Sequence, residues 1–314
     1  MIHRDAGLVE TSMPSMGTNH EDTKTLKIIP FAGCFGADAR AEGFRGPVFV
    51  GLPDDSQSSY LKGSAGAPEV IRVAYDGRCY NSTSESGIDL AGEVGDFGDI
   101  LAEDCFEKTY SKYRSVSESL FAAGKVPFFA GGDHAVTVPV VDGMKALGQP
   151  VQVVQIDAHP DLYPEFEGSR FSHACTAARI LEMDHVERVV QMGIRALSPI
   201  QQEQIKRFSS RLRLLEAREL DERIELADYI ECELPVYISV DMDGFDPAYA
   251  QGVSHPVPGG LSPRQVLNLF RPADWRLVGM DTVEVNPLRD VNNLTAILAA
   301  RVLHEGMAYS WLQS

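Results

Sequence analysis

The sequence predicts an α/β fold in which helices cover both faces of a mainly parallel sheet. Short apolar runs of strand length alternate with stretches of helical periodicity from Pro47 onward. These runs are apolar with few breaks, as expected for strands that are buried on both faces. Three of them end directly in clusters of histidine and aspartate, where open parallel sheets place their ligand sites.

An irregular segment is predicted before the first strand. Residues 1–45 are rich in Gly, Ala, Asp and Thr without clear periodicity, so they are assigned to an N-terminal extension. Residues 46–314 carry the alternating pattern and are assigned to a single domain. The strands predicted in this domain are 48–52, 126–130, 151–156, 189–194, 236–240 and 277–283.

Two helices have recognisable ends. One is predicted over residues 107–123, and Gly124 supplies its C-terminal stop. The other is predicted over residues 294–311, with the preceding pair Asn292 and Asn293 as its N-terminal cap.

The balance of charged residues limits the kinds of binding partner that are expected. Lys and Arg number 28 against 45 Asp and Glu, a net charge of -17, which argues against a nucleic-acid partner. An acidic surface attracts cationic small molecules, although it serves solubility equally well. The first residues lack the pattern of a secretory signal, and no apolar run approaches the roughly twenty residues of a membrane span. The sequence therefore predicts a cytoplasmic protein without a membrane partner.

The first chemical cluster is Gly131-Gly132-Asp133-His134, directly after the strand 126–130. The two glycines would let the backbone turn sharply, so that His134 points into a site. The motif alone has a plainer interpretation, in which His134 is a hydrogen-bonded structural residue and the glycines serve only the turn. His134 becomes a candidate metal ligand together with the clusters that follow.

The second cluster contains Asp157, His159 and Asp161, after the strand 151–156. Strand alternation would point these three side chains the same way. A solvated acidic turn is the alternative, but three like-facing ionisable groups at a buried strand end would repel one another or lose hydration without a cation.

The third cluster repeats this arrangement, because Asp241 and Asp243 follow the strand 236–240. Asp246 precedes a proline and is interpreted as a turn residue or a supporting residue.

Together these clusters offer four carboxylates and two imidazoles: His134, Asp157, His159, Asp161, Asp241 and Asp243. The set is too large for one tetrahedral ion and suits two divalent ions that share bridging carboxylates. Two such ions lower the pKa of a bound water, so the predicted reaction is hydrolysis. The residues alone leave the electrophile open between phosphorus, an amide carbon and a guanidinium carbon.

Two further residues are candidates for substrate chemistry. Glu284 follows the strand 277–283, and its carboxylate matches the planar fork of a guanidinium group; a surface glutamate is the alternative. His173 opens a helical stretch and is a candidate proton carrier for a departing amine, with a structural histidine as the alternative.

The chain resembles the ureohydrolase family of arginases and agmatinases from about Val48 to the C-terminal helix. The resemblance rests on four motifs in the family order: Gly-Gly-Asp-His, Asp-Ala-His-Pro-Asp, Ser-Val-Asp-Met-Asp-Gly-Phe-Asp-Pro and Val-Glu-Val-Asn-Pro. The segments 157–179 and 252–260 look most like plant-type arginases and the bacterial agmatinases near them.

The resemblance implies a three-layer αβα sandwich, so that residues 46–314 form one ureohydrolase catalytic domain. It implies Mn²⁺ as the usual metal, with Ni²⁺ or Co²⁺ as alternatives, and a homotrimer or homohexamer. By the same resemblance, one ion is bound by His134 and Asp161, the other by His159 and Asp243, and Asp157 and Asp241 bridge them. His173 is then the proton shuttle and Glu284 the guanidinium partner.

The implied reaction is hydrolysis of a guanidino compound to urea and an amine, with agmatine favoured. Two departures limit the transfer. Ala174 stands where many relatives have Gly, and Arg195 is followed by Ala-Leu-Ser where animal-type arginases place an aspartate for the α-amino group of arginine. Arginine is the second candidate, followed by guanidinobutyrate, other guanidino acids and small guanidines. A deacetylase-like amide hydrolase and a catalytically silent partner subunit are alternatives of another class, but the full ligand set disfavours both.

Overall fold

The computed structural model describes residues 29–77 and 80–313, and its core is one parallel sheet. The sheet has nine strands in the order β1-β3-β2-β4-β9-β8-β5-β6-β7, and every neighbouring pair is parallel. The strands are β1 (Phe35–Ala37), β2 (Pro47–Leu52), β3 (Val94–Asp99), β4 (Val126–Gly131), β5 (Val151–Ile156), β6 (Val186–Ile194), β7 (Leu212–Glu216), β8 (Val236–Asp241) and β9 (Leu277–Val283).

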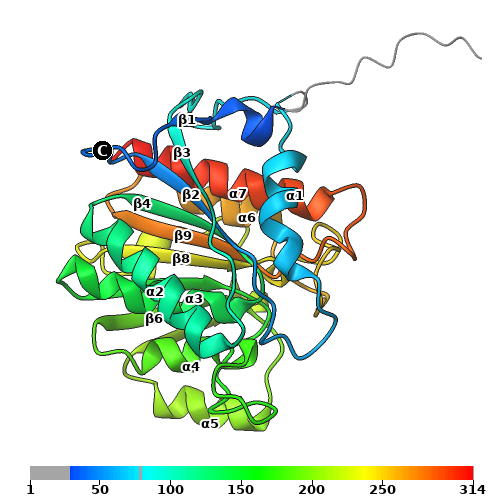
Figure 1. Cartoon of the computed structure of the whole chain (residues 1–314). Coiled ribbons are helices and arrows are strands. Elements are labelled where there is room, and N and C mark those ends of the chain that lie inside the picture. The colour runs from blue at the N-terminus through cyan, green and yellow to red at the C-terminus, as the bar shows by residue number, and fades with distance from the viewer. Residues whose placement is uncertain (1–28, 78–79, 314) are drawn as a thin grey trace, which may run out of the picture.

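Helices cover both faces of this sheet, so the predicted three-layer αβα sandwich is confirmed (Figure 1). One layer contains α1 (Ala67–Ala74), α6 (Pro263–Leu267) and α7 (Leu294–Trp311). The other contains α2 (Phe106–Ala122), α3 (Thr137–Gly143), α4 (Thr176–Leu181) and α5 (Pro199–Arg207). Successive strand residues such as Val153 and Val154 pack into opposite cores, which is why the central strands are apolar on both faces.

The register of the central strands places their carboxyl ends at one level. Ile156 of β5 lies opposite Val240 of β8, and Val240 lies opposite Thr282 of β9. Thr282 in turn lies opposite Ala130 of β4. The segments that leave β4, β5, β8 and β9 therefore meet at one edge of the sheet, as the sequence predicted for three of them.

Some local predictions need correction. Residues 1–28 of the predicted irregular extension lie outside the described residues, but β1 falls within the extension and pairs with β3. Gly124 does follow the end of α2, with a φ of 69°. Asn293 precedes α7 but makes no side-chain cap; Asp290 accepts hydrogen bonds from the amides of Thr295 and Ala296 instead.

Among the described residues, none of the helices combines the length and the apolar character needed to span a bilayer.

Candidate metal centre and substrate pocket

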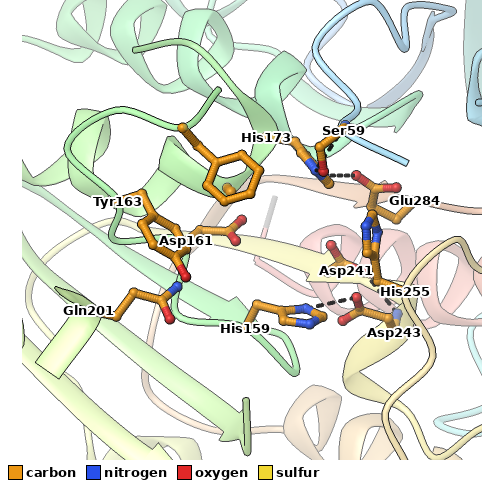
Figure 2. Close-up of a pocket in the computed structure, with 12 residues that line it drawn as sticks. Ser59, His159, Asp161, Tyr163, His173, Gln201, Asp241, Asp243, His255 and Glu284 are labelled. Carbon is orange, nitrogen blue, oxygen red and sulfur yellow. Dashed lines mark hydrogen bonds and ion pairs between the residues drawn. The ribbon is translucent and has the colours of Figure 1, made fainter. Parts of the chain in front are cut away.

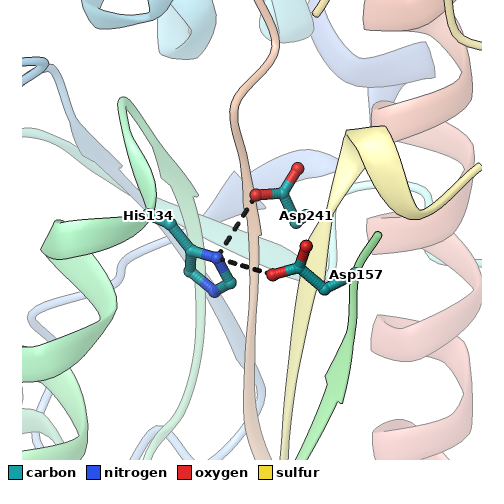
Figure 3. Close-up of side chains that lie close together, drawn as sticks. All are labelled: His134, Asp157 and Asp241. Atoms are coloured by element: carbon teal, nitrogen blue, oxygen red, sulfur yellow. Dashed lines mark ion pairs between the residues drawn. The ribbon is translucent and has the colours of Figure 1, made fainter. Parts of the chain in front are cut away.

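His134 faces three carboxylates at the ends of the central strands, and Figure 3 shows two of them, Asp157 and Asp241. Its Nδ1 atom is 3.1 Å from Oδ2 of Asp157, 3.1 Å from Oδ2 of Asp161 and 3.2 Å from Oδ2 of Asp241. All four residues are buried. Buried carboxylates at this spacing repel one another unless protons or a cation offset their charge.

His159 forms a second group beside the first. Its Nδ1 atom is 3.0 Å from Oδ2 of Asp243 and 3.6 Å from Oδ1 of Asp157. Asp157 therefore turns one oxygen to each histidine and belongs to both groups. This is the placement expected of a carboxylate that bridges two ions.

The structure brings all six predicted ligands together: His134, Asp157, His159, Asp161, Asp241 and Asp243. Asp241 differs from the expected bridge in one respect, because its Oδ1 accepts a 2.9 Å hydrogen bond from the amide of Asp243. Carboxylate oxygens and imidazole nitrogens suit Mn²⁺, Zn²⁺, Fe²⁺, Co²⁺ or Ni²⁺. The donor set fits two such ions.

A hydrogen-bonded chain behind His134 fixes which ring nitrogen can bind an ion. Nε2 of His134 lies 3.0 Å from Oγ of Ser239, and Ser239 donates to Asp281 over 2.7 Å. Because Ser239 donates its only hydroxyl hydrogen to Asp281, its oxygen can only accept from His134. Nε2 of His134 therefore carries a hydrogen and donates it to Ser239. Nδ1, which is buried, faces the carboxylates and has no well-aligned hydrogen bond among the described residues, is then the nitrogen that would bind an ion.

Without ions, the charges of this site are balanced by protons. Burial lowers the pKa of His159, but Asp243 and Asp157 outweigh burial and raise it to about 12. Burial and the neighbouring Asp157 raise the pKa of Asp161 to about 6. Burial and Asp243 raise the pKa of Asp241 well above its ordinary value. Divalent ions would take the place of these protons.

Glu284 and His173 lie on the same pocket, at the end of β9 and before α4 (Figure 2). Oε1 of Glu284 lies 3.0 Å from Nδ1 of His173 and accepts a 3.0 Å hydrogen bond from the amide of His134. Burial lowers the pKa of His173, but Glu284 outweighs burial and raises it to about 9. Nε2 of His173 lies 2.9 Å from the hydroxyl of Ser59.

The other oxygen of Glu284, Oε2, bears on whether the pocket binds a ligand. Oε2 is buried and has no hydrogen-bond partner among the described residues. Desolvation raises the pKa of this carboxyl, but His173 and the amide of His134 outweigh it and lower the pKa, so the group stays charged. A buried carboxylate oxygen without a hydrogen-bond partner is costly unless a ligand satisfies it.

The pocket has a volume of about 190 Å³. Six predicted site residues line it, together with residues that the sequence did not assign to the site: Ser59, Tyr163, Phe166, Ala174, Gln201 and His255. Tyr163, Phe166, Ala174 and His255 lie in the segments 157–179 and 252–260, which resemble the family, but the sequence assigns them no role in the site. Ser59 and Gln201 lie outside these segments and follow no motif that carries chemistry.

His255 is the most central of the unassigned residues. Its ring centroid lies 5.1 Å from that of His173, 6.1 Å from that of His159 and 5.6 Å from that of Tyr60. Burial and His173 lower the pKa of His255, so it is neutral where His173 is protonated. The ring of His255 therefore lines the pocket beside both His173 and His159.

The backbone near the site is held by contacts that the motifs do not reveal. Arg195 donates hydrogen bonds to the carbonyl groups of Asp243, Gly244 and Phe245, and so fixes the turn after β8. Gly132 has no room for a side chain, because a Cβ would collide with the backbone of Asp54. Close approach, and not an unusual φ, therefore explains this glycine of the first cluster.

Comparisons with known proteins agree with this geometry. The model of the arginase family matches residues 45–308. Arginase 2 of Arabidopsis thaliana is 39% identical over 82% of this chain and 78% of its own length. The mitochondrial agmatinase of Gallus gallus is 32% identical over 82% of this chain and 79% of its own length. The structure of the arginase from Medicago truncatula superposes with a TM-score of 0.76 at 34% identity, over 85% of this chain and 88% of that one.

Proposed function

Because this chain belongs to the arginase family, we propose that it hydrolyses a guanidino compound to urea and an amine with two divalent metal ions. The observation that supports this reaction best is the buried, unpartnered oxygen of Glu284 on the pocket that holds the metal-ligand groups. A guanidinium group offers the paired N–H donors that such a carboxylate lacks.

The residues have separate tasks in this proposal. Glu284 binds the guanidinium and holds its carbon toward the carboxylate cluster. His173 donates from Nδ1 to Glu284, so its Nε2 atom is the one that can pass a proton to the leaving amine. The two ions, bound by the six ligands, would supply an activated water and offset the negative charge.

Mn²⁺ is the ion we propose, with Ni²⁺ and Co²⁺ as alternatives. Support comes from the ligand types, which are oxygen and imidazole without any thiolate.

We rank two candidate substrates above the others. Agmatine is the first, because no aspartate follows Arg195 to bind an α-amino group. Ser198, at the end of that segment, instead caps α5 by accepting from the amide of Gln201 over 3.3 Å. Arginine is the second, because the arginase of Arabidopsis thaliana is more similar to this chain than the agmatinase of Gallus gallus.

The test is urea release from agmatine, arginine, guanidinobutyrate, guanidinopropionate and guanidine. The enzyme would be loaded separately with Mn²⁺, Ni²⁺ and Co²⁺, and compared with enzyme treated with a chelator. We expect urea from at least one compound with loaded enzyme and none after chelation. Inertness toward every guanidino compound, with cleavage of acetyl-lysine, would point to the deacetylase-like alternative.

We also propose a homotrimer or homohexamer in the cytoplasm. Leu288, Val291 and Leu294 support self-association, because these apolar side chains of one short segment are 82%, 48% and 53% exposed. Light scattering would give the mass of the assembly, and a monomeric mass would contradict it. Fractionation of the source cells would test the location.

A further inference from the structure

Gln201 is a buried pocket residue that no metal or guanidinium task uses. It is 4% exposed and is the third residue of α5. Its Oε1 atom accepts a 3.0 Å hydrogen bond from the amide of Ser198, and its own amide donates to the hydroxyl of Ser198. This reciprocal cap fixes the orientation of the side-chain amide, because only the oxygen can accept from Ser198.

The nitrogen of the same amide therefore faces the pocket. Figure 2 shows it pointing toward the hydroxyl of Tyr163. Among the described residues, none forms a hydrogen bond to this nitrogen. An amide nitrogen has two hydrogens and no lone pair to offer, so it presents donors only.

The carboxylates of the pocket also bear on which end group a substrate can have. Its four lining carboxylates are Asp161, Asp241, Asp243 and Glu284, and all of them belong to the metal or guanidinium groups. No carboxylate among the lining residues is left for a cationic end of the substrate. An ammonium group at the far end of a substrate would meet the side-chain nitrogen of Gln201, which is also a donor. A carboxylate or carbonyl at that end would instead accept a hydrogen bond from this nitrogen.

We infer that Gln201 selects guanidino compounds whose far end is a carboxylate or another hydrogen-bond acceptor over compounds that end in an ammonium group. This inference rests on the proposed guanidino hydrolysis and names the substrate class. It reverses the substrate order proposed above from the segment after Arg195, and places guanidinobutyrate and arginine ahead of agmatine. Guanidinobutyrate and agmatine form the sharpest pair, because they share the guanidine and a short methylene chain and differ in the sign of the end group.

The test is the ratio of kcat/KM for guanidinobutyrate to that for agmatine. The parent should favour guanidinobutyrate. Gln201→Glu keeps an oxygen for the amide of Ser198, since glutamate serves the same cap, but replaces the pocket-facing donor with a negative oxygen. The ratio should fall by on the order of tenfold to a hundredfold, with the gain on the agmatine side. Gln201→Met, which removes the donor without adding charge, should also lower the ratio, because kcat/KM for guanidinobutyrate falls when its carboxylate loses this donor.

A matched control lies in α6, where Gln265 forms the same reciprocal cap with Ser262 away from the pocket. Gln265→Glu should leave the ratio unchanged. If the parent prefers agmatine, or if Gln201→Glu keeps the parental ratio with normal metal content, the inference fails while guanidino hydrolysis stands. If no guanidino compound is cleaved, the proposed function itself fails.

Discussion

Glu284 combines two unfavourable features in one residue. Its φ is 64°, in the left-handed region that residues other than glycine rarely adopt. Its Oε2 atom is buried without a partner among the described residues. The fold holds this conformation through the amide of Glu284, which donates to the carbonyl of Gly132 over 2.8 Å. Backbone strain and a buried carboxylate oxygen without a hydrogen-bond partner, combined in one pocket residue, are typical of a functional position.

Glu284→Gln should therefore reduce kcat/KM for the preferred guanidino compound by on the order of a hundredfold or more, because the amide keeps the shape but loses the charge. Metal content and thermal melting should stay near the parental values. Urea release and elemental analysis measure the two effects. Glu305→Gln is a suitable control, because Glu305 is another buried glutamate outside the pocket. Near-parental efficiency of Glu284→Gln would make Glu284 an ordinary structural acid.

Single site residues could be predicted where they lie at the end of a buried strand. His134, Asp157 and Asp241 follow buried strands, so their convergence could be predicted from strand alternation and parallel order. Gln201 and His255 lie in a helix cap and a long turn, where spacing along the chain does not indicate direction in space. Only the packing of α5 and of the 252–260 segment against the strand ends brings them to the pocket.

Among the elements, the central strands were predictable and the outer ones were not. β5 and β8 are buried at every position, and such apolar runs stand out in a sequence. β3 contains Gly95 and Gly98 and is half exposed, and β7 is only partly buried. These strands near the sheet edges are less completely buried than the central ones, so their sequences lack the continuous apolar signal. β1 has three residues and was included in the irregular extension for the same reason.

Helix α7 contains a buried histidine whose titration should affect stability. His304 is fully buried, with Nδ1 3.0 Å from the hydroxyl of Tyr75 and Nε2 3.0 Å from the carbonyl of Ser82. Burial outweighs the Ser82 carbonyl and lowers the pKa of His304 from 6.5 to about 4. Between these values the unfolded chain binds the proton and the folded chain does not, so acidification favours unfolding.

The free energy of unfolding should therefore fall by roughly 3 kcal/mol through this group as pH drops from about 6.5 to about 4, with little further loss from it below that range. His304→Gln keeps a hydrogen-bonding side chain that does not titrate. Urea unfolding of both proteins at several pH values measures the difference. The variant is expected to lose less stability than the parent across this window, and parallel curves would show that His304 contributes nothing.

At the scale of the whole molecule, the sheet and the metal centre depend on each other. The ligands come from segments that follow β4, β5 and β8 and lie between residues 134 and 243 of the chain, whereas these strands are adjacent or nearly adjacent in the sheet. These segments meet because the parallel strands end at the same level of the sheet. Five of the six ligands are buried at this sheet edge and His159 is partly exposed, and hydrophobic packing cannot compensate the desolvation of the buried ones.

Removing divalent ions should therefore weaken the fold as well as abolish turnover. In the ion-free protein the carboxylates stay together only with added protons, as the raised pKa values of Asp161 and Asp241 indicate. An ion at a hundred times its dissociation constant would stabilise the folded state by roughly 3 kcal/mol, because the unfolded chain has no assembled site. Calorimetric melting of chelated protein, before and after Mn²⁺ is restored, should show a rise in Tm of several degrees. Asp241→Asn should show a smaller rise, because an amide replaces a charged ligand, whereas Glu284→Gln should respond like the parent. Melting curves that do not change with Mn²⁺ would mean that these six residues do not hold an ion.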